Sequence, residues 1–399
     1  RLKDWIFSLG NIAATYEKNI ALLAIKCLYE LQDSETMKSI CSSFLAGGNG
    51  ELCLKELNIT PVDSAALFEF LGNSKNLKRL IFDDCRIQGN YSYNKMNKSL
   101  LCNPTNCITF LKLAGNFTSG GVEYLSDALK SENCKLTSLD LGYNEMTDQG
   151  AKYLSEALKS ENCKLTSLDL SFNTTTDQGA EYLGDALKSE NCKLTSLDLG
   201  NSEITDEGAK YLSKALKSGD CKLTSLDLGH SGITDQGAEY LSDALKSGNC
   251  KLTSLGLGNN GITDQGAEYL SDALKSGNCK LTSLILADNG VTGQGAKYLS
   301  GALTSENCEL TLLNLAGNEI ADQGVEYLCR ASESKECKLA SLNLADNGVT
   351  DEGVKYVGAA VKSENCKLIS LNLAVNEITD QGAEYLRAAL KSQNSKLSL

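Results

Sequence analysis

Apolar and polar positions recur in one fixed order along most of this chain, and the order repeats every 29 residues without an insertion from Cys134 to Ser395. Each repeat begins with leucines that alternate with polar residues, such as Leu136, Leu139 and Leu141. A period of two is typical of a half-buried strand, because successive side chains of a strand point to opposite faces. A fixed period of this length predicts a solenoid, in which each repeat buries its apolar face against its neighbours.

A helical pattern follows each predicted strand. In the first regular repeat, Ala151, Leu154 and Leu158 fall on one face at helical spacing. Thr147 or Asp148 is expected to supply an oxygen acceptor for the free amides at the start of that helix. The opposite face carries polar residues and is expected to contact water (Lys152, Ser155, Glu156 and Lys159).

The combined unit, L-x-x-L-x-L-x-x-N followed by a helix, resembles the leucine-rich repeat, and its length resembles the ribonuclease-inhibitor subclass. This resemblance implies an α/β solenoid with parallel strands on the inner, concave side and helices on the outer side. Such an array curves because a helix is wider than the roughly 4.8 Å between neighbouring strands.

The first 48 residues do not repeat, and a glycine-rich boundary from Gly47 to Gly50 separates them from the array. Their apolar spacing predicts helices (Trp5, Ile6 and Leu9; Ile20, Leu23, Cys27 and Leu31; Met37, Ile40 and Phe44). Three irregular repeats follow. In the second, Cys85 replaces the turn asparagine, and residues 89–94 are so polar that we expect a surface loop instead of a helix. The third contains Asn116.

Two of these opening segments resemble NOD-like receptors. Residues 24–33, AIKCLYELQD, are similar to the helix that closes the helical subdomain of those receptors. Residues 59–71, ITPVDSAALFEFL, are similar to their first leucine-rich repeat. The resemblance implies that residues 1–48 are the tail of that subdomain and that residues 49–399 are a sensor region of about twelve repeats.

The same resemblance implies a cytoplasmic innate immune receptor. Its array would sense a microbial or danger ligand, or bind its own nucleotide-binding module and hold that module inactive. ATP or ADP belongs to the upstream module, and we expect no cofactor in this chain because it has no Gly-x-x-x-x-Gly-Lys-Ser/Thr segment. Repeats of this subclass also occur in ribonuclease inhibitors, which wrap a basic enzyme, and in GTPase-activating scaffolds. Both stay open as alternative functions.

The net charge of −13 and the isoelectric point near 4.8 argue against nucleic acid or an anionic membrane as partner, since both require a basic surface. A basic protein surface is the partner that this charge favours. Nine cysteines recur 29 residues apart, from Cys134 to Cys366, and we expect buried thiols in a reducing, cytoplasmic compartment. No apolar run approaches the roughly 20 residues of a membrane-spanning helix.

Catalytic chemistry has few candidates in this sequence. His230 is its one histidine, so neither a Cys-His dyad with an alternative base nor a histidine-rich metal site can be assembled. Cysteine pairs at two-residue spacing are missing, which removes the usual zinc-ribbon motif. We therefore expect a protein that is not an enzyme and binds no metal.

The variable positions of the repeats locate a candidate partner-binding surface. The residue between the last two strand leucines is expected on the concave face, where four aspartates follow one another (Asp140, Asp169, Asp198 and Asp227). Like charges about 5 Å apart repel by roughly 1–3 kcal/mol, and a cationic partner relieves that repulsion. Aromatic side chains beside an acidic column are typical of a protein-binding hot spot. Variable residues lie just after the four strands (Tyr143, Phe172, Asn201 and His230). Three of them, Tyr143, Phe172 and His230, have aromatic side chains.

A purely structural interpretation of these residues stays open. Repeat duplication can copy aspartates that only keep the strand-lined face soluble, and the position after each strand can be a turn residue that is free to vary. Ser202 and Ser231 replace the turn asparagine, and serine satisfies fewer backbone groups. Our hypothesis is that residues 192–249 are the softest part of the array.

Overall fold

The computed structural model describes residues 15–30, 34–43, 50–115, 119–392 and 396–397. The chain divides into two compact units: unit 1 spans residues 1–175 and 185–198, and unit 2 spans residues 176–184 and 199–399. Several sequence predictions lie outside the described residues (Trp5, Ile6, Leu9, Leu31, Phe44, Asn116 and the side chain of Ile20).

Unit 1 contains six parallel strands in its described part, each hydrogen-bonded to the next in chain order (β1, Glu51–Lys55; β3, Arg79–Asp83; β5, Phe110–Ala114; β6, Ser138–Asp140; β7, Ser167–Asp169; β8, Ser196–Asp198). Two short strands pair separately (β2, Asn58–Ile59; β4, Arg86–Ile87). Its helices precede or follow these strands (α2, Thr15–Glu30; α3, Ser34–Ser43; α4, Pro61–Gly72; α5, Gly89–Lys95; η2, Met96–Leu101; α6, Ser119–Leu129; α7, Asp148–Leu158). Helix α8 (Asp177–Leu187) has residues in both units.

Unit 2 continues the strand-then-helix order with six more described parallel strands (β9, Ser225–Asp227; β10, Ser254–Gly256; β11, Ser283–Ile285; β12, Leu312–Asn314; β13, Ser341–Asn343; β14, Ser370–Asn372). A helix stands before or after each of them (α9, Asp206–Leu216; α10, Asp235–Leu245; α11, Asp264–Leu274; α12, Gly293–Leu303; α13, Ala321–Ser332; α14, Asp351–Ala360; α15, Asp380–Leu390).

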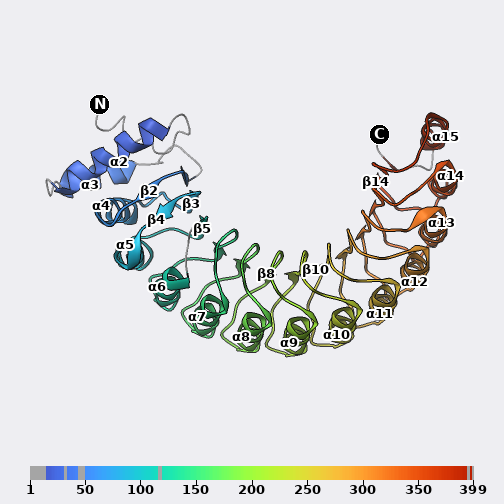
Figure 1. Cartoon of the computed structure of the whole chain (residues 1–399), viewed down its shortest axis with the longest axis horizontal. Coiled ribbons are helices and arrows are strands. Elements are labelled where there is room, and N and C mark those ends of the chain that lie inside the picture. The colour runs from blue at the N-terminus through green and yellow to red at the C-terminus, as the bar shows by residue number, and fades with distance from the viewer. Residues whose placement is uncertain (1–14, 31–33, 44–49, 116–118, 393–395, 398–399) are drawn as a thin grey trace. The chain divides into compact units, whose positions relative to one another are not determined.

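Within each unit, the strands line one side and the helices line the other (Figure 1). The strand side is called the inner face below. Equivalent leucines face each other in register, as Leu139 and Leu168 do in unit 1 and Leu255 and Leu284 do in unit 2. The predicted α/β solenoid with a parallel sheet is therefore confirmed.

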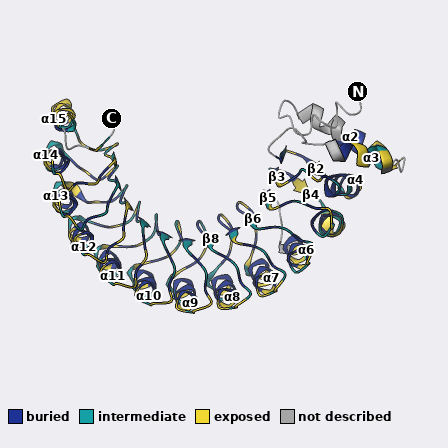
Figure 2. Cartoon of the chain, turned by 180° about the vertical axis from the view of Figure 1, so that it is seen from behind, coloured by how far each residue is buried: buried dark blue, intermediate teal, exposed yellow. Residues whose placement is uncertain are grey.

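The core lies between strands and helices, and the buried residues follow that boundary (Figure 2). Leu139, Ala151 and Leu154 are at most 1% exposed, and burying a leucine contributes about 1.5–3 kcal/mol. The expectation that Ser155 contacts water is wrong, because Ser155 is buried. The equivalent Ser213 shows the reason: its hydroxyl donates to the Tyr240 carbonyl of the next repeat.

The repeating cysteines are buried at the start of every regular repeat (Cys134, Cys163, Cys192, Cys221, Cys250, Cys279, Cys308, Cys337 and Cys366). Burial raises the pKa of Cys134 and of Cys279 to about 11, although backbone hydrogen bonds act in the opposite direction. Thiols with so high a pKa stay protonated near neutral pH and are poor nucleophiles. They act as small apolar groups of the core, as the sequence predicts.

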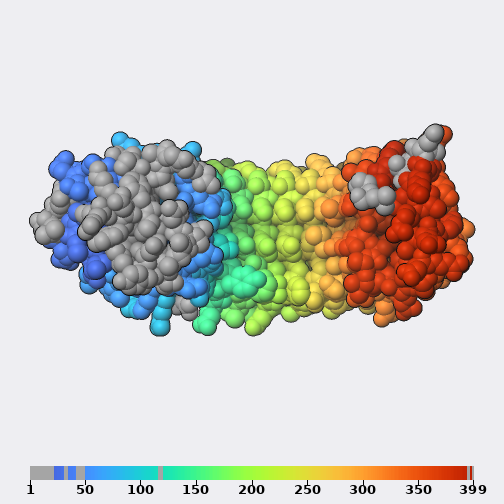
Figure 3. All heavy atoms as spheres, turned by 90° about the horizontal axis from the view of Figure 1, so that it is seen from above, coloured from blue at the N-terminus to red at the C-terminus, as the bar shows by residue number. Residues whose placement is uncertain are grey.

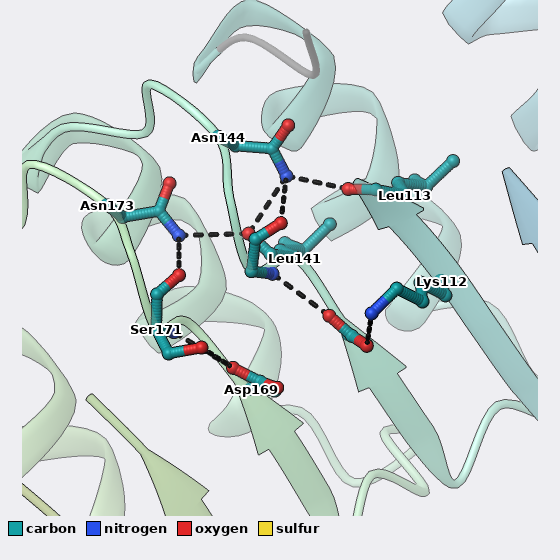
Figure 4. Close-up of polar contacts among 9 residues, drawn as sticks. Lys112, Leu113, Leu141, Asn144, Asp169, Ser171 and Asn173 are labelled. Atoms are coloured by element: carbon teal, nitrogen blue, oxygen red, sulfur yellow. Dashed lines mark hydrogen bonds and ion pairs between the residues drawn. The ribbon is translucent and has the colours of Figure 1, made fainter. Parts of the chain in front are cut away.

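The turn asparagines connect neighbouring repeats. The Nδ2 group of Asn173 donates to the Leu141 carbonyl of the previous repeat at 2.9 Å and to the Ser171 carbonyl at 3.1 Å (Figure 4). Its Oδ1 accepts the N–H of Met146 at 2.9 Å. Cys85 performs both functions in the second irregular repeat, because its Sγ lies 3.3 Å from the Leu54 carbonyl and accepts a backbone N–H at 3.4 Å.

Threonine and aspartate divide the capping of the helix N-termini between them. Thr205 Oγ1 accepts the N–H of Glu207 in its own helix, α9. Asp177 instead serves the next repeat, since its Oδ1 accepts the N–H groups of Thr205 at 2.7 Å and of Gly208 at 2.9 Å. At the start of α7 itself, the Thr147 side chain makes no capping hydrogen bond, so the prediction is wrong for that threonine. In the later repeat, the threonine caps its own helix and the aspartate caps the following one.

Helices α2 and α3 precede the first repeat, where the sequence predicts helices. Met37 and Ile40 are buried in α3 as expected. In α2 the predicted apolar face is wrong, because Leu23 is 57% exposed and Cys27 is also exposed. Its buried side chains belong to a neighbouring stripe of the same helix (Leu22, Ala24, Ile25 and Leu28). No helix in the described part of the chain has the length and apolarity needed to cross a membrane.

The second irregular repeat has a helix where the polar sequence predicts a loop. Residues 89–95 form α5, and residues 96–101 form the π-helical turn η2. Tyr93, Met96 and Leu100 are buried. These residues are three and four positions apart and form the apolar face of the helix, which the many polar residues between them hide in the sequence. The expectation of a surface loop at residues 89–94 is wrong.

Protonation of Asp63 is expected to loosen α2 from α4. Lys26 Nζ donates to Asp63 Oδ1 at 3.0 Å. Burial alone would raise the pKa of Asp63, but hydrogen bonds from Thr60 and Lys26 outweigh it and hold that pKa below its ordinary value of 3.8. The stability that this contact adds is fully present above about pH 4 and is lost as the pH falls through the lowered pKa.

Hydrogen exchange tests this expectation. Protection factors of the α2 amides should fall below about pH 4 in the wild type. An Asp63→Asn variant should show lower protection already at pH 6 and little further change on acidification. Identical pH profiles of protection for the two proteins would contradict the role given to this ion pair.

Candidate protein-binding surface

The inner face of unit 1 presents every second strand residue. Asp140, Asp169 and Asp198 lie in register with one another and with Lys112. They alternate with buried leucines such as Leu139, so their side chains point away from the core. The structure thus places these aspartates on the strand-lined face. In Figure 3 this side of the middle repeats is turned towards the viewer.

Two of these acidic residues, Asp140 and Asp169, also have a local structural role. Asp140 Oδ1 accepts the N–H of Gly142 at 3.0 Å, and Asp169 Oδ1 accepts the N–H of Ser171 at 2.9 Å. In unit 2, Asn314 Oδ1 accepts the equivalent N–H at 3.1 Å. Since asparagine makes the same bond, this contact does not require the negative charge.

Lys112 neutralises one end of the acidic column. Its Nζ lies 2.7 Å from Asp140 Oδ2, and the Asp140 side chain is 15% exposed. The hydrogen bond to Asp140 and the negative charges of Asp140 and Asp169 raise the pKa of Lys112 above its ordinary value. Lys112 therefore relieves part of the repulsion within the acidic column at Asp140. Asp169 has no ion pair with a described residue, and its Oδ1 accepts a hydrogen bond from the Ser171 hydroxyl at 2.7 Å.

Tyr143 and Phe172 follow β6 and β7 and stack on each other. Their ring centroids are 4.0 Å apart, their planes differ by 11°, and the residues are 60% and 41% exposed. Both have left-handed backbone, with φ of 58° and 54°. This backbone costs each bulky residue about 1–2 kcal/mol, and therefore about 2–4 kcal/mol for the two, whereas their stacking contributes about 0.5–1.5 kcal/mol. The stacking does not offset the backbone cost, so the fold does not gain from these aromatic rings.

The remaining predicted residues lie in unit 2. Asn201 and His230 have the same left-handed backbone, with φ of 53° and 52°, and His230 is exposed. Asp227 Oδ1 accepts the N–H of Gly229 at 2.8 Å, like its counterparts in unit 1. The structure therefore brings five of the predicted residues together on unit 1 (Asp140, Asp169, Asp198, Tyr143 and Phe172) and places three on unit 2 (Asp227, Asn201 and His230).

Nine segments of the sequence match the family model described as Leucine Rich repeat (residues 132–155, 161–184, 190–213, 219–242, 248–271, 277–300, 306–329, 335–358 and 364–386). Together these segments cover more than half of the chain. The chain belongs to the leucine-rich repeat family. Members of this family are typically non-catalytic scaffolds that bind protein partners on an extended surface.

The fold is similar to that of an internalin from Listeria monocytogenes, known from a crystal structure. That chain is 21% identical, the TM-score is 0.50, and the match covers 90% of this chain and 87% of the internalin. So low an identity supports the fold alone. No curated protein matches this leucine-rich repeat sequence.

The inner face of this leucine-rich repeat array also holds a cluster that the sequence analysis missed. Arg79 in β3 lies in register with Glu51 in β1 and with Phe110 in β5. Its guanidinium carbon lies 3.7 Å from the centre of the Phe110 ring, and its Nε donates to Glu51 Oε2 at 2.8 Å. Extending the serine column of the regular repeats back into the irregular ones would have found these residues, because Phe110 pairs with Ser138.

A metal site needs several His, Cys, Asp or Glu side chains that converge on one point. Among the described residues, no three His, Cys, Asp or Glu side chains lie close enough together to hold a metal ion. Burial raises the pKa of Cys134 and of Cys279, so these two thiols are poor nucleophiles at neutral pH. The surface that the described residues form is suited to recognition.

Proposed function

We propose that this chain is a non-catalytic recognition array that binds a basic protein partner on the inner face of unit 1. The observation that carries the proposal is the exposed, stacked pair Tyr143 and Phe172, which follows strands that carry Asp140 and Asp169. Aromatic side chains dominate the binding energy of many protein interfaces, and charge beside them directs the approach of a partner.

The charge of the chain supports a cationic partner. The net charge is −13, and within the inner face of unit 1 the described cations are already paired with carboxylates, as Lys112 is with Asp140 and Lys55 with Asp83. A cationic surface adds attraction at Asp169, whereas an acidic one meets repulsion there. The association rate should therefore fall as the salt concentration rises.

A random-peptide library displayed on phage tests this proposal. Peptides that the wild-type chain selects should carry net positive charge, and their affinity should fall by about tenfold or more for an Asp169→Asn/Asp198→Asn variant. The matched control is Asp127→Asn/Asp185→Asn, which removes the same charge from exposed helical positions of unit 1. Selection without a charge preference, or equal affinity for both variants, would overturn the proposal.

We further propose that the array is the sensor region of a cytoplasmic NOD-like receptor in innate immunity, with residues 1–48 as the end of the preceding helical subdomain. The segments at residues 24–33 and 59–71 support this assignment. Its ligand would be microbial or danger-associated, or its own nucleotide-binding module, which would also hold the ATP or ADP. The reading frame before Arg1 tests this assignment, because a phosphate-binding loop within the preceding few hundred codons is expected and its absence there would refute it.

The acidic charge also favours one second candidate, a ribonuclease-inhibitor-like protein that wraps a basic enzyme. Inhibition of a basic pancreatic ribonuclease by a stoichiometric amount of the chain would support this candidate. An unchanged rate of RNA hydrolysis would dismiss it.

A further inference from the structure

We propose that the Tyr143–Phe172 pair selects arginine over lysine in the partner, with a guanidinium group stacked on the exposed rings and paired with the Asp169 carboxylate. This inference rests on the proposed function and names the chemistry of the partner at that site. The ligand is thus an arginine-containing segment of a basic protein.

Unit 1 already contains the same arrangement within its own chain. The Arg79 guanidinium lies over the Phe110 ring at 3.7 Å while its Nε donates to the Glu51 carboxylate at 2.8 Å. These three residues lie on adjacent strands of the inner face. The inner face of unit 1 therefore holds one guanidinium that contacts both a ring and a carboxylate. The same face also offers a second pair of rings, which are exposed, and the half-buried carboxylate of Asp169.

Arginine fits this second set better than lysine does. A guanidinium is planar, so it can stack on a ring and still direct N–H groups sideways to a carboxylate, whereas an ammonium is a compact and strongly hydrated charge. Tyr143 and Phe172 lie nearly parallel, at 11°, and so present flat surfaces to a planar group. Asp169 Oδ1 is held in place by the Ser171 hydroxyl at 2.7 Å, and Asp169 Oδ2 has no described ion-pair partner.

The fold does not require aromatic side chains at these two positions. Gly115, Asn201 and Asn259 occupy the same left-handed position in other repeats, with φ of 74°, 53° and 52°. Glycine and asparagine adopt this backbone more readily than tyrosine or phenylalanine. Replacing both rings by asparagine should therefore leave the array folded, which makes binding testable separately from stability.

Fluorescence anisotropy with labelled nona-arginine and nona-lysine peptides tests the inference. At low salt the wild-type chain should bind nona-arginine about tenfold more tightly than nona-lysine. A Tyr143→Asn/Phe172→Asn variant should bind both peptides with the affinity that the wild type has for nona-lysine, and should melt at the same temperature or higher. The control is Val375→Asn, which changes an exposed apolar residue with the same left-handed backbone in unit 2.

Two failures can be told apart. Equal affinity of the wild type for both peptides, or an arginine preference that persists in the double variant, overturns the arginine inference even when binding depends on Asp169. Binding of both peptides that is unaffected by Asp169→Asn/Asp198→Asn overturns the proposed function itself.

Discussion

Replacing Asn289 by alanine is expected to lower the free energy of unfolding of the array by about 3 kcal/mol. The Asn289 side-chain amide donates to the carbonyls of Leu257, Leu286 and Ala287 at 2.9, 3.2 and 3.1 Å. Its Oδ1 accepts the N–H of Ile262 at 3.1 Å. Alanine leaves these backbone groups without a partner in a half-buried turn, and two of them belong to the preceding repeat. Chemical unfolding followed by circular dichroism measures the change.

Asn278 provides the matched control for this substitution. Its exposed side chain makes one bond to the preceding repeat, from Nδ2 to the Lys246 carbonyl at 2.9 Å. Asn278→Ala should cost about 1 kcal/mol or less. Equal stability of the two alanine variants would show that the hydrogen bonds of the turn asparagines are not what connects neighbouring repeats.

The hydrogen bonds of the turn asparagines also explain why we expect low local stability around Ser202 and Ser231, which lack that side chain. The Ser202 hydroxyl donates to the Leu199 carbonyl at 2.6 Å, and the Ser231 hydroxyl donates to the Gly229 carbonyl at 3.5 Å, both within their own repeats. Neither of these two bonds reaches the preceding repeat, whereas bonds of Asn260 and Asn289 do. Amides in these two serine turns should exchange faster than those in the asparagine turns.

Replacing Asp235 by alanine should destabilise the next repeat, with an expected cost of about 2 kcal/mol. Asp235 Oδ1 accepts the N–H groups of Thr263 and Gly266 at 2.7 and 2.9 Å, and Oδ2 accepts the Thr263 hydroxyl at 2.7 Å. These are the free amides at the start of α11, so the variant removes a cap that one repeat supplies to another.

Asp243 tests whether this effect comes from capping or from charge alone. Its exposed carboxylate makes an ion pair with Lys246 in its own helix, at 3.1 Å. Asp243→Ala should change stability by less than about 0.5 kcal/mol. Hydrogen exchange should locate the loss in Asp235→Ala at the start of α11, and a loss spread over all helices would contradict the capping role.

The repeat fold could be predicted from the sequence because one pattern recurs nine times. The strand leucines, such as Leu139, and the helix residues Ala151 and Leu154 are buried as their periods indicate. Segments that occur only once in the chain cannot be compared with other copies of themselves, so their elements are harder to predict. Polar residues obscure the helical pattern over residues 89–101. In α2 two adjacent stripes carry apolar residues, so their spacing alone does not show which stripe is buried.

The candidate surface was only partly predictable for a different physical reason. The period of two places Asp140 and Asp169 on the inner face. A repeat pattern does not show how side chains from successive repeats meet. The Lys112–Asp140 ion pair, the stacking of Tyr143 on Phe172 and the contacts of Asp177 with the next helix all join residues about one repeat apart.

Photo-crosslinking tests most directly whether the inner face of unit 1 is the binding surface. A nona-arginine peptide that carries a benzophenone group would be bound to the chain, and the complex would be irradiated. Mass spectrometry would then identify the cross-linked residues. The account predicts cross-links within residues 138–144 and 167–173, and their loss in the Asp169→Asn/Asp198→Asn variant. Cross-links on the exposed faces of α7 and α8, or spread evenly over the molecule, would contradict it.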